Sequence, residues 1–376
     1  MILITMLTRV GLRSGAIPLF LISVVLTATA CRNKSPTETP STPLLETARA
    51  SFYRGVELMD EGASHYDEAL EAFQAGYTIS PDLWEAHLNE GIVELRRGRL
   101  NAAAKAFQHS KEIYPSPEGL EALGEVYIRQ GKADKAVELY ERALASDPND
   151  LHLRIRLAVA LSNAGHNDQA RAELRAVLGH DTDNLDAYNA LAAIHIFDGD
   201  LDMAELILKK GISRHPTDPA LLANMGLVAL RRGNDQVAFQ HFDQASKANP
   251  KFLVGRLNKA AVFLGAGDHR HAREELEFVL QVEPGNIRAR LGLGLAKRLE
   301  GDLKGARLSW QTLLEYAPEN PDAYFNLAVL SLDFEDDPSG ARAHLLSFME
   351  LAPNDHPRMS AAESRMALIA AIMESE

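Results

Sequence analysis

The sequence is poor in the residues that carry cross-links and positive charge. Its 376 residues include one cysteine, Cys31, so no internal disulfide can form. Basic residues are outnumbered by acidic ones, 39 to 52, and the formal net charge is −13. This balance disfavours nonspecific binding to nucleic acid and electrostatic attachment to anionic lipid.

Patterns typical of catalytic and metal sites are also missing. None of the 13 histidines lies in a His-Glu-x-x-His motif. His269 and His271 lie at an expected turn, where solvated side chains are a better interpretation than a metal site. Gly292 and Gly294 lack the preceding strand and the lysine motif of a nucleotide loop. Residues 333–337 are acidic without the EF-hand pattern, so we expect an exposed loop. The sequence therefore predicts no enzyme activity, no cofactor and no metal.

The first 30 residues are typical of an export signal. A basic start precedes an apolar run over residues 16–30, which is too short for a comfortable transmembrane span. The run ends in Ala28-Thr29-Ala30 before Cys31, and there it resembles the bacterial lipoprotein signal. The resemblance implies that residues 1–30 are removed as a signal peptide and that Cys31 is lipidated. An ordinary secretory signal and a short uncleaved anchor are the alternatives.

Residues 31–47 are rich in proline, serine and threonine, which is typical of a semi-extended tether. A lipid anchor needs such a segment to hold a folded domain away from the bilayer. Arg32 follows the cysteine at the position where aspartate can retain a lipoprotein at the inner membrane. The resemblance therefore favours the bacterial outer membrane, with the chain facing the periplasm.

The rest of the chain contains a repeat with a period of 33 to 35 residues. One column consists of nine alanines: Ala69, Ala103, Ala136, Ala170, Ala204, Ala238, Ala272, Ala306 and Ala341. Four residues after each alanine stands a large apolar side chain: Phe73, Phe107, Tyr140, Leu174, Leu208, Phe242, Leu276, Trp310 and Leu345. Glycines such as Gly98 and Gly131 mark a turn between two helices of each unit, for example over residues 84–96 and 100–113.

The order of these columns resembles the tetratricopeptide repeat, most closely at Leu120, Leu123, Gly124, Tyr127, Gly131, Ala136, Tyr140, Ala143 and Pro148. The resemblance implies an all-α fold, a right-handed α-solenoid of about nine helix-turn-helix units over residues 48–354. A capping helix is expected over residues 355–376. Lys259 stands where leucine is usual, which predicts a rotated helix or looser packing. Residues 366–373 are apolar on all sides, more than a cap requires.

In arrays of this family the first helix of each unit lines a concave groove, so the resemblance also implies a partner surface. In units six to nine the groove positions are mostly apolar and include Leu227, Leu230, Leu257, Leu264, Leu291, Leu295, Phe325 and Val329. We expect this surface to bind an amphipathic helix or an apolar peptide of an envelope protein, and no nucleic acid or small-molecule substrate. The alternative is that some of these side chains pack against neighbouring units.

Charged groove positions are few in these units. Arg288 and Arg298 occupy two of them. Asn258 and Arg288 fit two positions of a known clamp for C-terminal carboxylates. Most other clamp positions are apolar, so we reject the clamp. In unit three, Glu118, Glu121 and Glu125 lie on the same wall at helical spacing. They could meet a basic partner segment or form no more than a solvated face.

A lipid-anchored array of this length resembles lipoproteins that organise multi-protein machines at the bacterial outer membrane. The resemblance implies a non-catalytic scaffold that binds other envelope proteins, of the kind found in gliding-motility complexes. A pilotin-like assembly factor for a type IV pilus or secretion-system secretin is the alternative. A non-catalytic subunit of an envelope enzyme complex is a third possibility. These assignments are family analogies, because tetratricopeptide arrays serve many unrelated roles.

Overall fold

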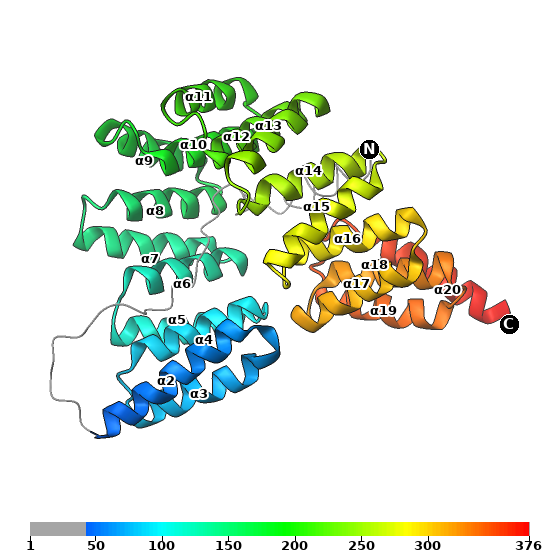
Figure 1. Ribbon diagram of the computed structural model, residues 1–376, viewed down its shortest axis with the longest axis horizontal. Helices are drawn as coiled ribbons and strands as arrows, with labels where there is room; N and C mark the ends of the chain where they lie inside the picture. Colours follow the sequence, from blue (N-terminus) through cyan, green and yellow to red (C-terminus); the bar gives the residue numbers. More distant parts are fainter. Residues whose placement is uncertain (1–42, 376) are drawn as a thin grey trace. The chain divides into compact units, whose positions relative to one another are not determined.

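The computed structural model describes residues 43–375 (Figure 1). Within this range the chain forms nineteen α-helices and no strand, which confirms the all-α prediction. The expected signal at residues 1–30, the lipidation site Cys31 and most of the tether lie outside the described residues. The first helix begins at Pro43, so the last residues of the range expected for the tether are helical. None of the described helices combines the length and the apolar character needed to cross a bilayer.

The helices alternate between the first and the second helix of nine successive units. The first helices are α2 (Pro43–Glu61), α4 (Trp84–Arg96), α6 (Pro117–Arg129), α8 (Leu151–Asn163), α10 (Leu185–Asp198), α12 (Pro219–Arg231), α14 (Leu253–Gly265), α16 (Ile287–Glu300) and α18 (Pro321–Phe334). The second helices are α3 (Tyr66–Ile79), α5 (Leu100–Ile113), α7 (Ala133–Ser146), α9 (Asn167–His180), α11 (Leu201–Arg214), α13 (Asp235–Ala248), α15 (His269–Val282), α17 (Leu303–Tyr316) and α19 (Pro338–Leu351). A last helix, α20 (Met359–Ser375), follows the ninth pair, and a short 3-10 turn, η2 (Ala63–His65), separates α2 from α3.

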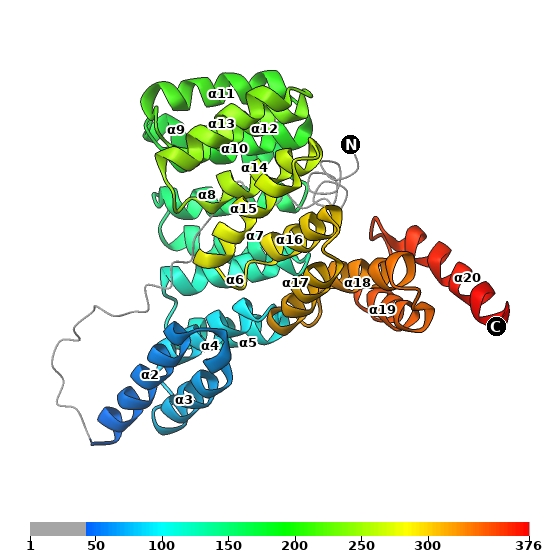
Figure 2. The same ribbon diagram turned by 45° about the vertical axis from the view of Figure 1, so that its right-hand side comes forward.

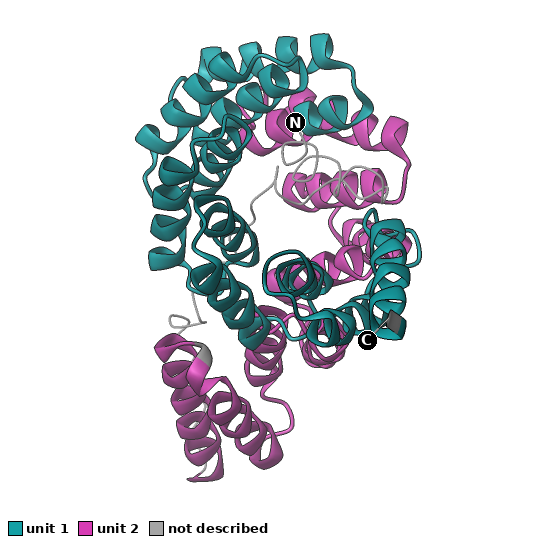
Figure 3. Cartoon of the chain, turned by 90° about the vertical axis from the view of Figure 1, so that its right-hand side faces the viewer, with its two compact units in different colours: residues 1–21, 191–376 teal, residues 22–190 magenta. Residues whose placement is uncertain are grey.

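The helix pairs are distributed over two compact bodies, which are coloured separately in Figure 3. Of the described residues, 43–190 belong to the first, here called the N-terminal body, and 191–375 to the second, the C-terminal body. The division falls within α10. Each body is a series of stacked helix pairs, as expected for a solenoid whose units contact only their neighbours.

The two repeat columns form the contact between the helices of each pair. All nine alanines of the first column are fully buried, and the large side chains four residues later are at most 3% exposed. Small residues on the first helix receive those large side chains. A Cβ added to Gly91 would lie 2.5 Å from the ring of Phe107, and one added to Gly226 would lie 2.5 Å from the ring of Phe242. Only glycine leaves room for the ring at these two positions, so the columns determine how closely the helices approach.

The turns between paired helices depend on a left-handed residue. Seven glycines, from Gly98 to Gly301, have φ between 71° and 88° at the end of the first helix. In the ninth unit Asp336 takes this conformation with φ 54°, and Asp337 caps α19 by accepting a hydrogen bond from the Gly340 amide at 2.8 Å. Aspartate tolerates the left-handed region better than most residues. The acidic segment 333–337 is exposed, as the sequence predicts.

Within each body the first helices lie on the inner side of the curve. Besides its neighbours in sequence, α14 contacts both α12 and α16, and in the N-terminal body α4 contacts both α2 and α6. Successive second helices do not approach one another to the same extent. A stack in which one layer is more tightly spaced than the other curves toward the tighter layer. The surface of the first helices is therefore called the inner side below.

Lys259 does not loosen the packing of α14 as the sequence suggested. Its side chain is 11% exposed, and its Nζ lies 3.0 Å from Asp243 Oδ1 on α13 and 2.7 Å from Glu275 Oε1 on α15. Arg256 lies 2.7 Å from the second Glu275 oxygen, and Lys247 lies 2.7 Å from the second Asp243 oxygen. The lysine therefore replaces the apolar contact of a leucine with ion pairs to both second helices that flank α14.

The C-terminal helix packs on the ninth unit with only part of its apolar surface. Ala362 and Ile369 are fully buried in a cluster with Leu345 and Phe348 of α19. Leu368 and Met373 remain 52% and 45% exposed. The last turns of α20 extend past α19 (Figure 2). Apolar surface beyond the needs of a cap, expected from residues 366–373, is thus present on this helix.

Candidate partner-binding surface

The inner side of the C-terminal body is built by helices with well-defined ends. Asp218 caps α12 by accepting a hydrogen bond from the Leu221 amide at 2.8 Å, and Pro219 occupies the first turn, where no amide donor is needed. Asn286 caps α16 in the same way, and Gly301 ends it in the left-handed conformation. These caps set the register of each helix, and the register decides which side chains face inward.

The structure divides the eight predicted groove residues into two groups. Four are buried: Leu230, Leu257, Leu264 and Phe325. Four are half-buried: Leu227 on α12, Leu291 and Leu295 on α16, and Val329 on α18. The buried four are part of the packing between units, as the alternative interpretation expected for some of them. The half-buried four are called the inner apolar row. Among the eight predicted groove residues, these are the ones that a ligand could contact.

Phe325 shows how a predicted groove residue can be covered by other parts of the chain. Its ring packs edge-on against Phe348 of α19, with ring centroids 5.3 Å apart. The guanidinium groups of Arg358 and Arg365 lie 5.0 and 5.6 Å from its centroid. The segment that follows the ninth unit therefore covers this residue, and a partner cannot reach most of the ring.

Three arginines accompany the inner apolar row. Arg288 and Arg298 lie on α16, as the sequence placed them, and Arg231 lies on α12 four residues after Leu227. Burial lowers the pKa of Arg288 to about 10, and burial is also the main cause of the lowered pKa of Arg231 and Arg298. All three side chains are half-buried, so these cations are partly shielded from water. Sequence reasoning missed Arg231, although its spacing from Leu227 was sufficient to place it on the same face.

Two of these arginines contact a neutral group instead of forming an ordinary salt bridge with a carboxylate. Arg231 donates a hydrogen bond from Nη2 to the Ile196 carbonyl at 2.8 Å. Arg298 lies over the ring of Phe334, 5.4 Å from the centroid. The nearby Asp333 raises the pKa of Arg298 to a lesser extent than burial lowers it, and this carboxylate accepts a hydrogen bond from Arg365 at 3.3 Å. The positive charge of Arg231 and Arg298 is therefore only weakly compensated.

The acidic wall expected in the N-terminal body is largely neutralised. Glu121 on α6 forms an ion pair with Arg156 on α8, and both side chains are less than 20% exposed. Glu125 forms an ion pair with Arg129 one helical turn away. Glu118 is exposed. The structure thus favours a solvated and internally paired face over a dedicated site for a basic partner.

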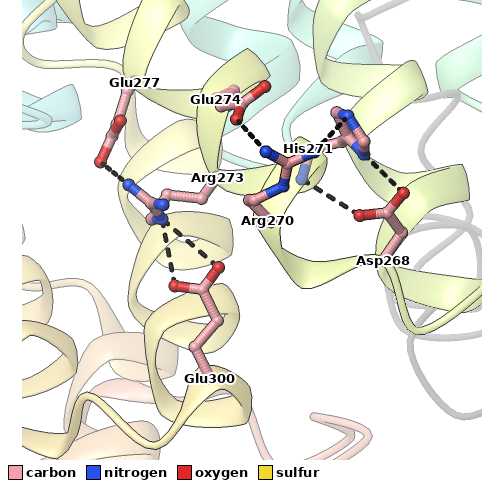
Figure 4. Close-up of polar contacts among 7 residues, drawn as sticks. All are labelled: Asp268, Arg270, His271, Arg273, Glu274, Glu277 and Glu300. Atoms are coloured by element: carbon pink, nitrogen blue, oxygen red, sulfur yellow. Dashed lines mark hydrogen bonds and ion pairs between the residues drawn. The ribbon is translucent and has the colours of Figure 1, made fainter.

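The sequence placed His269 and His271 in the turn before α15, but both lie in the first turn of this helix, and His271 takes part in a charged network (Figure 4). Asp268 caps the helix, accepting a hydrogen bond from the His271 amide, and its other oxygen lies 2.6 Å from His271 Nδ1. Arg273 joins α15 to α16 through Glu300 at 3.0 Å. Across the described residues no group of three or more histidine, cysteine, aspartate or glutamate side chains is placed to hold a metal ion. These side chains cap and link helices.

Models of known families identify the repeat. Two models described as tetratricopeptide repeat match residues 59–118, 127–194, 168–227 and 257–311, which together make up more than half of the chain. The chain is a tetratricopeptide-repeat protein. This confirms the family that the alanine, glycine and aromatic columns indicated, and with it the helical solenoid fold.

Known relatives share the repeat at low identity. The chain is 25% identical over 231 residues to protein O-mannosyl-transferase TMTC1 of Homo sapiens, a match that covers 60% of this chain and 26% of that protein. It spans between 26% and 42% of the length of the first curated relatives that it matches. Among solved structures, the APC/C hetero-tetramer Cut9-Hcn1 matches with a TM-score of 0.53 and 15% identity over 85% of this chain and 63% of that chain. The type IV pilus biogenesis factor PilW matches with a TM-score of 0.49 and 18% identity over 59% of this chain and 99% of that chain.

Membership of the tetratricopeptide-repeat family supports a scaffold more directly than an enzyme. TMTC1 is named as a transferase, but the match covers only 26% of that protein. Tetratricopeptide repeats typically hold protein partners and supply no catalytic group of their own. The chain is accordingly a repeat scaffold for protein–protein interaction.

Proposed function

We propose that this tetratricopeptide-repeat chain is a non-catalytic scaffold of the bacterial envelope that binds a partner segment on the inner side of its C-terminal body. The observation that carries this proposal is the inner apolar row, Leu227, Leu291, Leu295 and Val329. Each of these side chains still has apolar surface to bury, and burial of such surface contributes about 25 cal/mol per Å². A short amphipathic helix or an extended apolar peptide fits this arrangement.

The buried groove residues support the same function indirectly. Leu257 and Leu264 of α14 belong to one packed cluster with Leu276 and Val279 of α15. Close packing holds the first helices in a fixed orientation, so the inner apolar row is ordered before a ligand arrives. A preformed surface loses less conformational entropy on binding than a mobile one.

The partner surface is tested by placing a charge in the inner apolar row. Leu227→Asp and Leu295→Asp each introduce a carboxylate where a ligand would contact apolar atoms, and we expect partner affinity to fall at least about tenfold, or about 1.4 kcal/mol. Partners are captured by crosslinking in membranes and purified, and their dissociation constants are then measured with each variant. Leu308→Asp on α17 is the matched control, because Leu308 is 62% exposed on a second helix. Unchanged affinity in both inner variants, with native circular dichroism, would refute the assignment.

We further propose that the mature chain is attached to the outer membrane by a lipid on Cys31 and faces the periplasm. The support is the sequence Ala28-Thr29-Ala30-Cys31 at the end of an apolar run, followed by a proline-rich tether. Labelling with radioactive palmitate tests the modification. The native chain should incorporate label and sediment with membranes, whereas Cys31→Ser should do neither. Persistent labelling of the Cys31→Ser variant would show that the assignment is wrong.

The machine that the scaffold serves is proposed by analogy with gliding-motility lipoproteins of this family. Deletion of the gene should impair movement over surfaces while secretin rings form normally in the outer membrane. A secretin that stays monomeric or is misplaced in the deletion strain would instead favour the pilotin-like alternative. If both surface movement and secretin assembly are normal, neither assignment holds.

A further inference from the structure

The inner side of the C-terminal body alternates between charged and uncharged helices. On α14, the groove positions expected from the repeat are Val254, Leu257, Ala261 and Leu264; none is charged, and all but Val254 are buried. The neighbouring first helices both contact α14, and each carries arginine: Arg231 on α12, and Arg288 and Arg298 on α16. A partner lying across these three helices therefore meets an uncharged and mostly buried surface on α14, with arginines on the helices at both sides.

Helical spacing places the arginines beside the leucines that a ligand would contact. Leu227 and Arg231 are four residues apart and share one face of α12. On α16, Arg298 follows Leu295 by three residues and Leu291 by seven, which again defines a single face. On each of these two helices the apolar and cationic groups thus share one face.

The surroundings of these arginines favour an anion. Arg231 uses a backbone carbonyl as its hydrogen-bond acceptor, and Arg298 stacks on an aromatic ring. Burial lowers the pKa of both side chains, yet an arginine remains charged at neutral pH. A carboxylate placed in such partly shielded surroundings forms a stronger, charge-assisted hydrogen bond than it would on an open surface.

The acids already present on this side are engaged elsewhere. Asp322 lies 3.2 Å from Arg358 and 3.8 Å from His356, and Asp333 lies 3.3 Å from Arg365. The segment after the ninth unit therefore neutralises the two carboxylates of α18, while Arg231 and Arg298 form no equivalent salt bridge with any residue in the range 43–375. The inner side of the C-terminal body is therefore locally cationic, although the whole chain has a formal net charge of −13.

We propose that the partner of the C-terminal body is a protein segment whose apolar residues are bordered by aspartate or glutamate. Its apolar side chains contact Leu227, Leu291 and Leu295, and its carboxylates pair with Arg231 on one side and Arg298 on the other. This inference rests on the proposed scaffold function and specifies the chemistry of its ligand. A segment bordered by lysine or arginine would instead bring like charges together, which disfavours binding.

A displayed library of random peptides provides an unbiased probe. The library is selected on the purified full-length chain, and the enriched peptides are synthesised and measured by fluorescence anisotropy. We expect enriched peptides with apolar residues at helical or alternating spacing and acidic residues at both ends. Replacing these acids by their amides should weaken binding about tenfold, and the loss should shrink at high salt, where charge pairs are screened.

Charge-reversal variants assign the effect to particular residues. Arg231→Glu and Arg298→Glu should each weaken the acidic peptides at least about tenfold and strengthen peptides in which lysine replaces the acids. Arg342→Glu is the matched control, because Arg342 is exposed on the second helix α19 and carries the same change of charge. It should leave the affinity for both kinds of peptide unchanged.

The possible results separate this inference from the function on which it rests. Two results overturn the inference and leave the binding surface intact. In the first, the enriched peptides lose affinity for the Leu295→Asp variant but contain no acidic residues. In the second, they lose affinity for that variant but bind the Arg231→Glu and Arg298→Glu variants as well as the native chain. Peptides that bind equally well to the Leu295→Asp variant overturn both. A library without any enriched peptide also counts against both, because the proposed surface should select a short segment.

Discussion

The inner sides of the two bodies differ in how their charges are satisfied. In the N-terminal body, Glu121 pairs with Arg156 and Glu125 pairs with Arg129, so acids and bases neutralise each other within the protein. In the C-terminal body, Arg231 is bonded to a carbonyl and stays beside half-buried leucines. A half-buried cation that is paired with no carboxylate can still form a charge-assisted hydrogen bond with an anionic ligand. The contrast supports the proposal that the C-terminal body binds the partner.

The same two bodies are alike in the packing that holds each helix pair. Gly124 receives Tyr140 in the N-terminal body, just as Gly226 receives Phe242 in the C-terminal body. These contacts lie on the face of the first helix that meets its own second helix, whereas the charged residues lie on the inner face. One helix can therefore keep its packing face constant while its inner face changes, which is why a shared fold is compatible with different partners.

The largest expected effect is a loss of stability, and it tests the packing within helix pairs that the two bodies share. Phe107→Ala in the N-terminal body and Phe242→Ala in the C-terminal body each remove a fully buried ring from a helix pair. We expect each to lower the stability of its own body by about 3–5 kcal/mol, because a cavity replaces well-packed atoms. Amide hydrogen exchange should show the loss of protection mainly in the substituted pair and its neighbours.

Leu206→Ala is the control for these two variants, since Leu206 is 62% exposed on α11 and should change stability by less than about 0.5 kcal/mol. A clearly smaller loss for one of the two phenylalanines would mean that the columns contribute unequally. The two bodies would then share the geometry of this contact but not its contribution to stability.

The repeat columns could be read from the sequence because each depends on local sterics. A glycine that must accept a ring, or a turn residue that must take a positive φ, leaves few alternatives, as Gly91 and Gly98 show. An alanine that is fully buried between two helices is similarly restricted. Each column shows only a weak residue preference in a single unit. Because the preference recurs in nine units, it predicts the fold and the register of the helices.

The state of the inner side could not be read in the same way, because it depends on residues from other units. Phe325 is covered by Arg358 and Arg365, which belong to the segment after its own unit. The pairing of Glu121 with Arg156 joins two units. Position within the repeat therefore predicts the direction of a side chain, but its exposure and its charge partner depend on which side chain the neighbouring unit supplies.

Lys259 provides a test of intermediate size, because Leu123 occupies the same unit position in the N-terminal body and is fully buried. Lys259→Leu restores the usual residue but leaves Asp243 and Glu275 each with one cation fewer. We expect a loss of about 1–3 kcal/mol at neutral pH, measured by urea unfolding, since a charged hydrogen bond is removed from partly buried carboxylates. A more stable variant would show that the ion pairs are not needed for packing.

The pH dependence of that loss has a defined sign. Burial raises the pKa of Asp243, but its hydrogen bonds to Lys247 and Lys259 outweigh burial and leave the pKa lowered in the folded state. Its contribution to stability is therefore present above the unfolded pKa of about 4 and is lost as the pH falls through the lower folded value. The difference between the native chain and Lys259→Leu should shrink in that acidic range. A difference that stays constant there would exclude Asp243 as the relevant partner.

The smallest expected effect is the sharpest test of the contrast in charge. Arg156→Gln removes the partner of a partly buried glutamate, so it should destabilise the N-terminal body by about 1–2 kcal/mol. Arg298→Gln removes a cation that stacks on Phe334 without a strong salt bridge, so the stability of the C-terminal body should change by less than about 0.5 kcal/mol. Hydrogen exchange resolves the two bodies in one chain. Equal losses would mean that Arg298 stabilises the fold as Arg156 does, and the charge on the C-terminal inner side would then serve packing instead of a partner.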